Sequence, residues 1–425
     1  MIRPTPLWRS AAVLGVAGLV LTACGGSSDT ASTTPTKSGS ASAPAGAKGD
    51  GTLKLGTLLP QTGSLAFLGP PEFAGVGLAV KDINDAGGVN GKQVEVTNSD
   101  SGDTSTDTAS QSVDRLLSNN VDAIIGAASS SVSLSVIDKI TGAGVLQISP
   151  ANTSPELTDY ADKGLYFRTA PSDVLQGRVD GDLILSDGNT TLGILQLQDS
   201  YGTGLGDAVT ESFEGGGGQV VEKVVYDPKA ASFSTEVGKI KAADPEAIIL
   251  ISFEEAKKII PELVKQGIGP DKKKIYFVDG DIANYSKDFP KGTLTGAKGT
   301  LPGVVADDSF KARLMTVDSK LDQFAYAPES YDATVLVALA AQAAGDDSGA
   351  SIASKMQDVS AGGEKCTSFK DCLALLQDKK DIDYDGVSGP VEFNEKGDPS
   401  EATIGIYQYG ADNNYAFLEA KEGKL

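Results

Sequence analysis

The sequence predicts an α/β protein with two successive units, each containing a parallel sheet flanked by helices. Short apolar runs of strand length alternate with stretches of helix length, and the alternation restarts after residue 171. This strand–helix–strand rhythm favours parallel strands joined by right-handed crossovers. The composition agrees with a folded core, because 40% of the residues are hydrophobic and 22% are charged.

The first unit is expected to begin at Thr52. Its first β-type run ends at Pro60, and its first helical stretch is closed by Gly87 and Gly88. Proline and glycine at such points end strands and helices because of their backbone preferences. The expected strands span 52–59, 93–97, 121–126 and 145–148, and the expected helices span 72–86, 104–118 and 131–141.

The second unit repeats this rhythm, and consecutive glycines at 215–218 end one of its helices. Its expected strands span 192–197, 220–226, 247–251 and 275–278, and its expected helices begin near 173 and span 205–214, 233–241 and 254–266. The C-terminal third adds a long helix at 328–344 and two β-like runs at 390–393 and 402–409. This third is too poor in strands for a third sheet, so we expect the two units to share it.

Residues 1–23 have the pattern of a bacterial lipoprotein signal peptide. Arg3 and Arg9 precede an apolar run that is too short to span a membrane, and small residues lead directly to Cys24. This order resembles a lipobox, in which Cys24 is lipidated and becomes the mature N-terminus. An ordinary secretory signal with an incidental Cys is the alternative. Residues 24–51 are rich in Gly, Ser, Thr, Ala and Pro and are expected to form a flexible tether.

Charge and missing residue types exclude several classes of function. Asp and Glu number 57 against 36 Lys and Arg, and the resulting formal charge of −21 would repel a phosphate backbone, so nucleic-acid binding is not expected. The chain contains no His, which removes imidazole acid–base catalysis, the Ser-His-Asp triad and the HExxH zinc site. A G-x-S-x-G elbow and a P-loop are also missing. We therefore do not expect an enzyme.

Ordered segments along the chain resemble a known family of binding proteins. They read LKLGTLLPQTG at 53–63, AVKDINDAGGVNG at 79–91, AIIGAASS at 123–130, ISPANTSP at 148–155, FRTAPSD at 167–173, DSYG at 199–202 and GVSGPVEF at 386–393. Together they resemble the periplasmic branched-chain amino acid binding proteins, the Leu/Ile/Val-binding family of ABC importers. The resemblance spans residue 52 to about residue 409, and it is specific for the family rather than for one ligand.

The resemblance implies the type I periplasmic-binding-protein fold, in which two lobes are joined by three crossing segments and the ligand lies in the cleft between them. The crossings would fall near Pro171, Thr300 and Gly386. The lobes would contain residues 52–171 and 300–386 (lobe 1) and residues 172–299 and 387–425 (lobe 2). The cleft would lie at the carboxyl ends of the strands and close around the ligand by hinge motion.

Hydroxyl groups and free backbone N–H groups suit the carboxylate of an amino acid ligand. Ser129 and Ser130 follow an expected strand and precede a helix, where helix capping is the alternative role. The resemblance makes Ser130 the carboxylate donor, with Ala128 beside it. It also assigns a second hydroxyl to Thr153 and a backbone contact to Ala151, for which a Pro-containing turn is the alternative.

The ligand ammonium requires a carboxylate from the facing lobe. Asp279 follows an expected strand and is the candidate, although Asp281 lies two residues further on and the register between them stays open. By resemblance, Asp173 is an acidic cleft residue, with N-capping as the alternative. Tyr201 would cover the ligand, with a solvent-exposed loop position as the alternative. Leu68 stands where family members carry an aromatic residue, so the specificity of the pocket is left open.

A further motif has the spacing of a calcium-binding EF-hand loop. Asp381, Asp383, Asp385 and Glu392 occupy ligand positions. Pro390 lies inside this loop, no helix follows it, and the third crossing accounts for the same residues. We expect no metal and no cofactor.

Cys366 and Cys372 lie close together in the sequence and would be outside the cytoplasm after export. Their spacing allows a small disulfide loop in an oxidising compartment, and two free thiols are the alternative. A zinc site is not available, because the chain has 3 Cys and no His.

Together these features predict an extracytoplasmic, lipid-anchored solute-binding protein that delivers a small amino acid-like ligand to an ABC permease. Its expected partners are the ligand, the permease and, through Cys24, the bacterial cell membrane, and a monomer is expected. A ligand sensor of the same fold that signals to a receptor is the first alternative, and a lipoprotein enzyme is the second. Uptake assays would separate transport from sensing, and turnover of a candidate substrate would reveal an enzyme.

Overall fold

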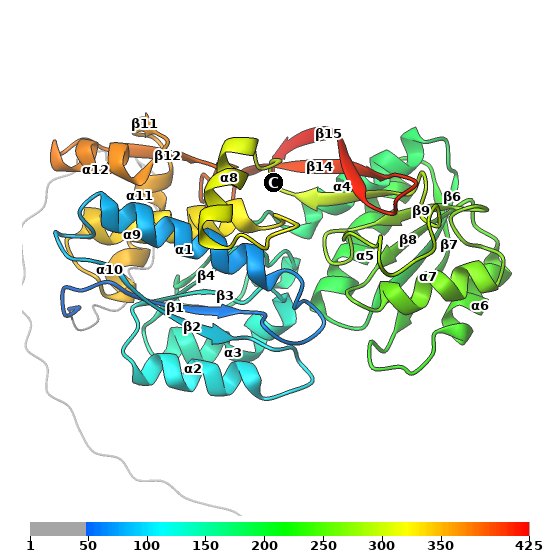
Figure 1. Cartoon of the computed structure of the whole chain (residues 1–425), viewed down its shortest axis with the longest axis horizontal. Coiled ribbons are helices and arrows are strands. Elements are labelled where there is room, and N and C mark those ends of the chain that lie inside the picture. Colours follow the sequence, from blue (N-terminus) through cyan, green and yellow to red (C-terminus); the bar gives the residue numbers. More distant parts are fainter. Residues whose placement is uncertain (1–47, 425) are drawn as a thin grey trace, which may run out of the picture. The chain divides into compact units, whose positions relative to one another are not determined.

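The computed structural model describes residues 48–424, which form two α/β units, each organised around a mainly parallel sheet (Figure 1). This arrangement confirms the fold class predicted from the alternation of strand-like and helix-like runs. The predicted signal peptide, Cys24 and most of the predicted tether lie outside the described residues.

The first sheet has five strands in the order β2-β1-β3-β4-β5, and all neighbouring strands are parallel. Its strands are β1 (Lys54–Leu59), β2 (Glu95–Asp100), β3 (Ala123–Gly126), β4 (Leu146–Ser149) and β5 (Tyr166–Arg168). Because β2 lies on one side of β1 and β3 on the other, the direction of winding reverses between β1 and β3. Open α/β sheets hold ligands at the carboxyl ends of the strands at such a point.

Helices cover both faces of the first sheet (Figure 1). One face carries α2 (Thr108–Ser118) and α3 (Ser130–Gly142), and the other carries α1 (Gly69–Asp85) and α9 (Ala327–Ala344). α9 is buried along most of its length and packs closely on α1, since a side chain at Gly75 would overlap the backbone of Ala327. The C-terminal third of the chain therefore supplies part of the core of the first unit.

The second sheet has seven strands in the order β15-β14-β10-β9-β8-β6-β7. Its strands are β6 (Thr191–Leu197), β7 (Gln219–Tyr226), β8 (Ala247–Ile251), β9 (Lys274–Phe277), β10 (Lys298–Pro302), β14 (Glu401–Tyr409) and β15 (Tyr415–Lys424), and its helices are α4 (Asp173–Ser186), α5 (Ser200–Gly215), α6 (Ser234–Ala243) and α7 (Ala256–Lys265). Strands β6 to β10 are parallel, whereas β14 and β15 are antiparallel to their neighbours. The winding reverses between β6 and β8, so the second sheet has a switch point of its own at the carboxyl ends of these strands.

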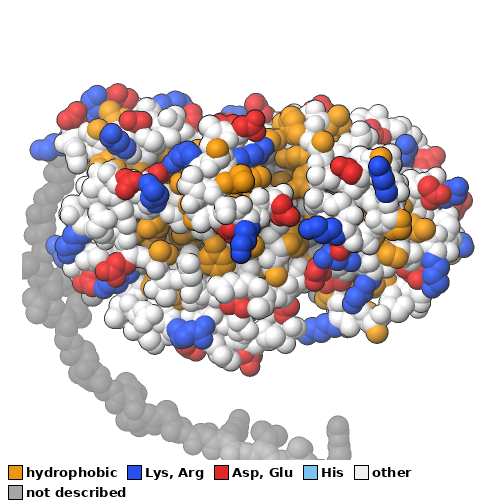
Figure 2. Space-filling model, in the orientation of Figure 1, with side chains coloured by type: hydrophobic (Ala, Val, Ile, Leu, Met, Phe, Trp, Pro, Cys, Tyr) orange, Lys and Arg blue, Asp and Glu red, His pale blue; other side chains and the backbone are white. Residues whose placement is uncertain are grey.

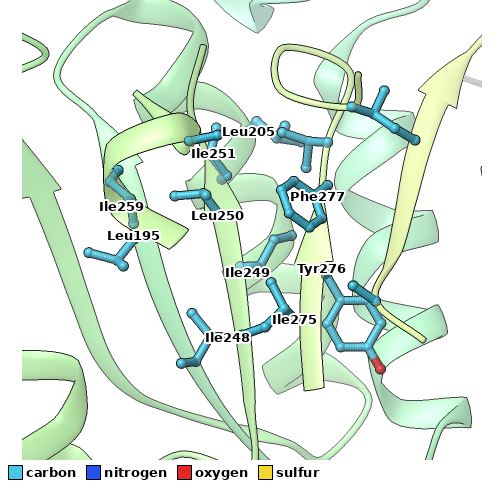
Figure 3. Packing of buried hydrophobic residues seen from close by; sticks show 14 of the residues in the cluster. Leu195, Leu205, Ile248, Ile249, Leu250, Ile251, Ile259, Ile275, Tyr276 and Phe277 are labelled. Atoms are coloured by element: carbon cyan, nitrogen blue, oxygen red, sulfur yellow. The ribbon is translucent and has the colours of Figure 1, made fainter. Parts of the chain in front are cut away.

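The core of the second unit surrounds β8, whose residues are all buried. Figure 3 shows side chains of β8 and β9, including Ile249 and Phe277, packed among Leu195, Leu205 and Ile259 from neighbouring elements. A continuous apolar strand of this kind is typical of a parallel sheet that is covered on both faces.

The C-terminal third differs from its prediction, because it ends in the unexpected strand β15 and forms a third, three-stranded sheet. Its strands are β11 (Glu364–Cys366), β12 (Ile382–Gly386) and β13 (Gly389–Pro390), and the remaining helical segments are α8 (Asp308–Val317), α10 (Gly349–Ala353), α11 (Met356–Ser360), α12 (Phe369–Gln377) and η1 (Pro155–Leu157). These strands are too short to give a period-two pattern in the sequence. The predicted disulfide between Cys366 and Cys372 is present and joins β11 to α12.

The face drawn in Figure 2 carries interspersed acidic and basic side chains, with hydrophobic side chains gathered over β14 and β15. Phe417 and Leu418 of β15 are about half exposed. Within residues 48–424, none of the helices combines the length and the apolar character that a membrane span requires.

Candidate functional site

A small cavity lies at the carboxyl ends of strands from the first and second sheets. Its lining consists of Leu65, Leu68, Ala128, Ser129, Ser130, Ala151, Tyr201, Phe253, Asp279, Gly280 and Tyr326. These residues follow β1, β3, β4, β6, β8 and β9, apart from Tyr326, which directly precedes α9. The volume open to the centre of a water-sized sphere is about 20 Å³, which is room for about one water. The two switch points therefore meet at a cavity that is nearly closed.

Ser129 and Ser131 have structural roles at the start of α3. The hydroxyl of Ser129 accepts a hydrogen bond from the backbone N–H of Val132 at 3.4 Å, so Ser129 is the N-cap of the helix. The hydroxyl of Ser131 lies 3.2 Å from the carboxylate of Asp199 and 2.9 Å from Ser200 Oγ, both beyond β6 of the second sheet. The capping alternative thus applies to Ser129, and Ser131 joins the two sides of the cavity.

Ser130 lines the cavity, whereas Thr153 lies outside the lining and is bonded to Ser130 through its backbone; both hydroxyl groups retain hydrogen-bonding capacity. Ser130 Oγ accepts from the backbone N–H groups of Thr153 at 3.3 Å and Ser154 at 3.2 Å, which leaves its O–H free to donate. Thr153 Oγ1 is buried and has no hydrogen-bond partner among the described residues. Ala128 and Ala151 also line the cavity.

Asn152 holds this polar edge in place, although sequence reasoning did not select it. Its amide donates to the carbonyl oxygens of Ala127 at 2.9 Å and Ala128 at 2.8 Å, and its side-chain oxygen accepts from the phenol of Tyr166 at 2.9 Å. The side chain is fully buried. A buried amide with satisfied donors and acceptor fixes the relative positions of the loops after β3 and β4.

Asp279 supplies the carboxylate on the opposite side of the cavity. It accepts hydrogen bonds from the phenol of Tyr201 at 2.6 Å, the phenol of Tyr326 at 2.7 Å and the amide of Gln176 at 3.0 Å. Burial raises the pKa of Asp279, and these hydrogen bonds oppose part of that rise. The carboxylate is therefore held in one orientation by donors that also surround the cavity.

Asp281 points elsewhere. Its carboxylate accepts from Ser252 Oγ at 2.7 Å and from the backbone N–H of Val278 at 2.8 Å, and it is not part of the cavity lining. The structure thus places Asp279 at the cavity and uses Asp281 to brace the turn that presents it.

Asp173 is the first residue of α4, but Ser172 is the N-cap, because its hydroxyl accepts from the backbone N–H of Val174. The capping alternative for Asp173 is therefore wrong. Its carboxylate is fully buried, lies outside the cavity lining and has no hydrogen-bond partner among the described residues. Burial raises the pKa of Asp173 well above its ordinary value, and nearby Asp279 raises it further.

Aromatic rings close the cavity from the second sheet and from α9. Tyr201 is 3% exposed and stacks on Phe253 with ring centroids 5.4 Å apart, so the solvent-exposed alternative for Tyr201 is wrong. Tyr326 has a left-handed backbone conformation with φ of 58°, which is unfavourable for a bulky residue and persists only where the surroundings impose it. Phe253 and Tyr326 were not among the residues predicted from the sequence. Phe253 could have been found, since it follows β8 as Asp279 follows β9.

The remaining walls are apolar. Leu65 and Leu68 lie on the loop between β1 and α1 and contribute aliphatic side chains, and Leu68 is the position at which the resembling family carries an aromatic residue. The lining contains no Lys or Arg. The buried guanidinium of Arg168 is bound to the carboxylate of Asp398 at 2.7 and 2.8 Å. The cavity therefore combines one carboxylate, several hydroxyl groups and an apolar wall.

The EF-hand spacing does not produce a metal site in the described part of the chain. Asp383 and Asp385 lie on β12, where the ammonium of Lys365 is 3.7 and 3.3 Å from them. Between residues 48 and 424, no group of three or more metal-binding side chains gathers at one point. The motif instead runs through β12 and β13, with Asp381 before the first strand and Glu392 after the second.

Comparison with known proteins points to one family. A family model described as periplasmic binding protein matches residues 52–403. The Leu/Ile/Val-binding protein homolog 1 of Brucella abortus is 27% identical over 376 residues, which cover 86% of this chain and 93% of the relative. A leucine-, isoleucine-, valine-, threonine- and alanine-binding protein of Pseudomonas aeruginosa is 30% identical over 217 residues, which cover 51% of this chain and 57% of the relative.

Solved structures share the fold over most of their length. The branched-chain amino acid transporter substrate binding protein LivJ of Streptococcus pneumoniae, in complex with isoleucine, has a TM-score of 0.72 at 22% identity and covers 88% of this chain and 100% of that one. An ABC transporter solute binding protein of R. palustris, in complex with benzoate, has a TM-score of 0.70 at 18% identity and covers 88% and 97%. The same architecture thus accommodates ligands of different chemistry.

Proposed function

The chain belongs to the periplasmic binding protein family, and we propose that it is the solute-binding component of an ABC importer for an apolar α-amino acid of the branched-chain type. The curated relatives are binding proteins and not enzymes, and the family is extracytoplasmic. The observation that carries the proposal is the position of Asp279 opposite Ser130 at the cavity, with the hydroxyl of Thr153 outside the lining.

This arrangement complements a zwitterion. The free O–H of Ser130 and the unpartnered hydroxyl of Thr153 are suited to the ligand carboxylate. The carboxylate of Asp279 is suited to the ammonium, with the phenols of Tyr201 and Tyr326 in position to share it. Both ligand charges leave water in a closed site, so each requires a partner of this kind.

The ligand side chain would contact an apolar wall. Leu65, Leu68 and Ala128 contribute aliphatic surface, and Phe253 adds an aromatic ring. Burial of a Val, Leu or Ile side chain contributes about 1.5–3 kcal/mol, whereas a charged side chain would find no counter-ion other than Asp279. These contacts favour a small aliphatic amino acid.

A benzoate-type ligand is the second candidate, because several solved structures of this fold contain one. A benzoate has no ammonium that could pair with Asp279. Its own carboxylate would be a second negative charge in the cavity, and the lining contains no Lys or Arg to balance it. The acidic cavity therefore favours an amino acid over an aromatic acid.

Ligand entry requires opening. The cavity has room for about one water, so an amino acid fits only when the residues on its two sides separate. Tyr201 and Asp279 follow strands of the second sheet, whereas Ser130 follows a strand of the first. We propose that the lobes, divided as the sequence predicts, rotate apart about the three crossings and close on the ligand.

The cellular context is also part of the proposal. Cys24 would be lipidated, tether the protein at the outer face of the cytoplasmic membrane and hold it near the permease. A sensor that passes its signal to a receptor would use the same cleft and anchor. Uptake of labelled ligand by cells with and without the protein distinguishes these two roles.

A ligand series tests the binding proposal. Leucine, isoleucine and valine should raise the melting temperature of the purified protein, since a ligand stabilises the folded state by RT ln(1 + [L]/Kd). Two matched controls are 4-methylpentanoate, which is leucine without its ammonium, and 3-methylbutylamine, which is leucine without its carboxylate. Calorimetry should show that both bind at least tenfold more weakly than leucine. If 4-methylpentanoate or benzoate binds as tightly as leucine, the amino acid proposal fails.

A further inference from the structure

A second, larger cavity lies at the segments that connect the two sheets. Its volume is about 490 Å³, within the range of small-molecule sites. Pro171 follows β5, Gly303 follows β10 and Ser388 precedes β13, so all three predicted crossings contribute to its wall. None of its lining residues belongs to the lining of the ligand cavity described above.

The side chain of Glu329 reaches this cavity from the first turn of α9. Glu329 is 2% exposed, and no other residue between 48 and 424 makes a hydrogen bond or an ion pair with its carboxyl group. Gly303 lies directly against it, because a side chain at this position would overlap Glu329 Oε1. Gly303 also has φ of 94°, a conformation that favours glycine. The backbone of the second crossing thus passes directly against a buried carboxyl group that no other described residue pairs with.

The other charged groups of the cavity leave an excess of negative charge. Glu401 is paired with the ammonium of Lys424 at 2.9 Å. Glu422, which is exposed, has no ion-pair partner among the described residues. Pro390, Val391 and Pro399 supply apolar surface to the cavity wall. A ligand that fits must therefore carry positive charge and present an apolar body.

We propose that this cavity is a second binding site, which takes a small aliphatic amine as its ammonium form. The ammonium would pair with the carboxylate of Glu329, and the alkyl chain would lie against Pro390, Val391 and Pro399. A diamine would place its second ammonium toward Glu422 at the exposed end. Burial makes the charged pair dependent on good geometry, so a short linear amine is favoured over a branched or bulky one.

Proton release accompanies this binding. Burial, with a smaller contribution from the charge of Asp332 on the same helix, raises the pKa of Glu329 to about 8. The other titratable or charged groups that face Glu329 are Glu72 on α1, Tyr326 before α9, Tyr407 on β14, and Glu401, Glu422 and Lys424 at the cavity. Below pH 8 the carboxyl group must lose a proton before it can pair with an ammonium. The affinity for an amine should therefore rise about tenfold per pH unit up to pH 8 and level off above it.

Calorimetry with 1,4-diaminobutane tests the site. The full chain is titrated at pH 6, 7, 8 and 9, in pairs of buffers with different ionisation enthalpies so that proton release is measured directly. The wild type should bind with the pH slope described above and should release close to one proton at pH 6. Glu329→Gln should bind at least tenfold more weakly at pH 8 and should lose the pH slope. Glu422→Gln should weaken 1,4-diaminobutane but leave butylamine unchanged.

Asp279→Asn is the matched control, since it converts a buried carboxyl group of the other cavity into an amide. It should leave amine binding intact. Loss of binding in Asp279→Asn with retention in Glu329→Gln would place the amine in the first cavity and overturn the proposal. Amine binding is also measured with 150 mM potassium chloride or 150 mM methylammonium chloride added as a competitor. If the two salts weaken binding equally, the site accepts an inorganic cation as readily as an amine, which would overturn the proposal as well. Binding of 1,4-diaminobutane by the wild type that does not depend on pH would also overturn the proposal, and this measurement does not depend on whether any variant folds.

Discussion

The phenol of Tyr201 donates a hydrogen bond of 2.6 Å to the carboxylate of Asp279, 78 positions further along the chain. Tyr326 donates to the same carboxylate at 2.7 Å. Asp279→Asn should weaken binding of the amino acid ligand by about 2–5 kcal/mol, because the buried ammonium loses its counter-charge. This corresponds to at least a tenfold rise in Kd, measured by calorimetry.

The control for this change is Asp281→Asn. The carboxylate of Asp281 braces Ser252 and Val278 rather than the cavity, so its loss should lower the melting temperature and leave the ligand affinity nearly unchanged. If Asp281→Asn is the variant that abolishes binding, the assignment of the acidic residue is wrong by two positions. If neither variant matters, the ligand does not carry an ammonium.

Adjacent serines should respond differently to the same substitution. Ser130→Ala should weaken ligand binding by about 1–3 kcal/mol, because a hydrogen bond to a charged group is lost. Ser129→Ala should instead lower the free energy of unfolding by about 0.5–2 kcal/mol, because Ser129 caps α3. Calorimetry and urea unfolding on both variants separate the effects. Equal losses of affinity in the two variants would contradict the assignment of Ser130.

The buried ion pair between Arg168 and Asp398 should be a main support of the fold. Its guanidinium is fully buried and bidentate, so Asp398→Asn strands a charge and should lower the free energy of unfolding by about 3–5 kcal/mol. Lys81 and Asp85 form an exposed pair, and Asp85→Asn should lower the free energy of unfolding far less than Asp398→Asn, because water screens exposed charges. Urea unfolding of both variants measures the two free energies of unfolding. A similar decrease in both variants would contradict the prediction.

Glu329 should make the folded state less stable as the pH rises. Burial raises its folded pKa from an ordinary 4.5 to about 8, so the folded state binds a proton that the unfolded state has already released. The stabilising effect of that proton is complete below about pH 4.5 and is lost as the pH rises toward 8, at about 1.4 kcal/mol per pH unit. The difference in stability between Glu329→Gln and the wild type should therefore grow in favour of the variant between pH 5 and 8. A constant difference over this range would show that Glu329 is already ionised.

The lipid anchor can be tested through Cys24. If Cys24 is acylated, Cys24→Ala should move the protein from the membrane fraction to the soluble extracytoplasmic fraction, because acyl chains supply the affinity for the membrane. Fractionation and labelling with a clickable fatty acid measure both consequences. Unchanged fractionation together with unlabelled Cys24 would leave an ordinary signal peptide as the explanation.

Short-range patterns were sufficient to predict the two α/β units and part of the site. The apolar runs at β3, β8 and β9 indicated strands, and the residues directly after them included Ser130 and Asp279. Tyr201, which was selected from the family resemblance, follows β6 in the same way. Each of these residues comes just after one strand in the sequence, so no contact with a distant segment is needed to locate it.

The residues that were missed depend on distant contacts. Tyr326 reaches Asp279 only because α9 packs on α1 of the first unit, and Gln176 meets Asp279 from α4. β15 escaped prediction because most of its residues are exposed at the edge of the sheet, which removes the usual alternation of buried and exposed side chains. The small third sheet was missed for the same kind of reason, since its pairing joins segments that have little strand character alone.

The first two turns of α9 have several tasks at once. Tyr326 donates a hydrogen bond to Asp279, and Glu329 borders the second cavity. Asp332 accepts hydrogen bonds from the backbone N–H groups of Val387 and Ser388 in the third crossing. From Tyr326 to Asp332 the helix rises only about 9 Å. An engineer who wished to turn this protein into a biosensor for a new analyte should therefore leave this segment untouched. Leu65 and Leu68 lie on the loop after β1, and Phe253 lies on the loop after β8. A library at these three positions can change which ligand side chain is recognised without disturbing the opening and closing of the lobes.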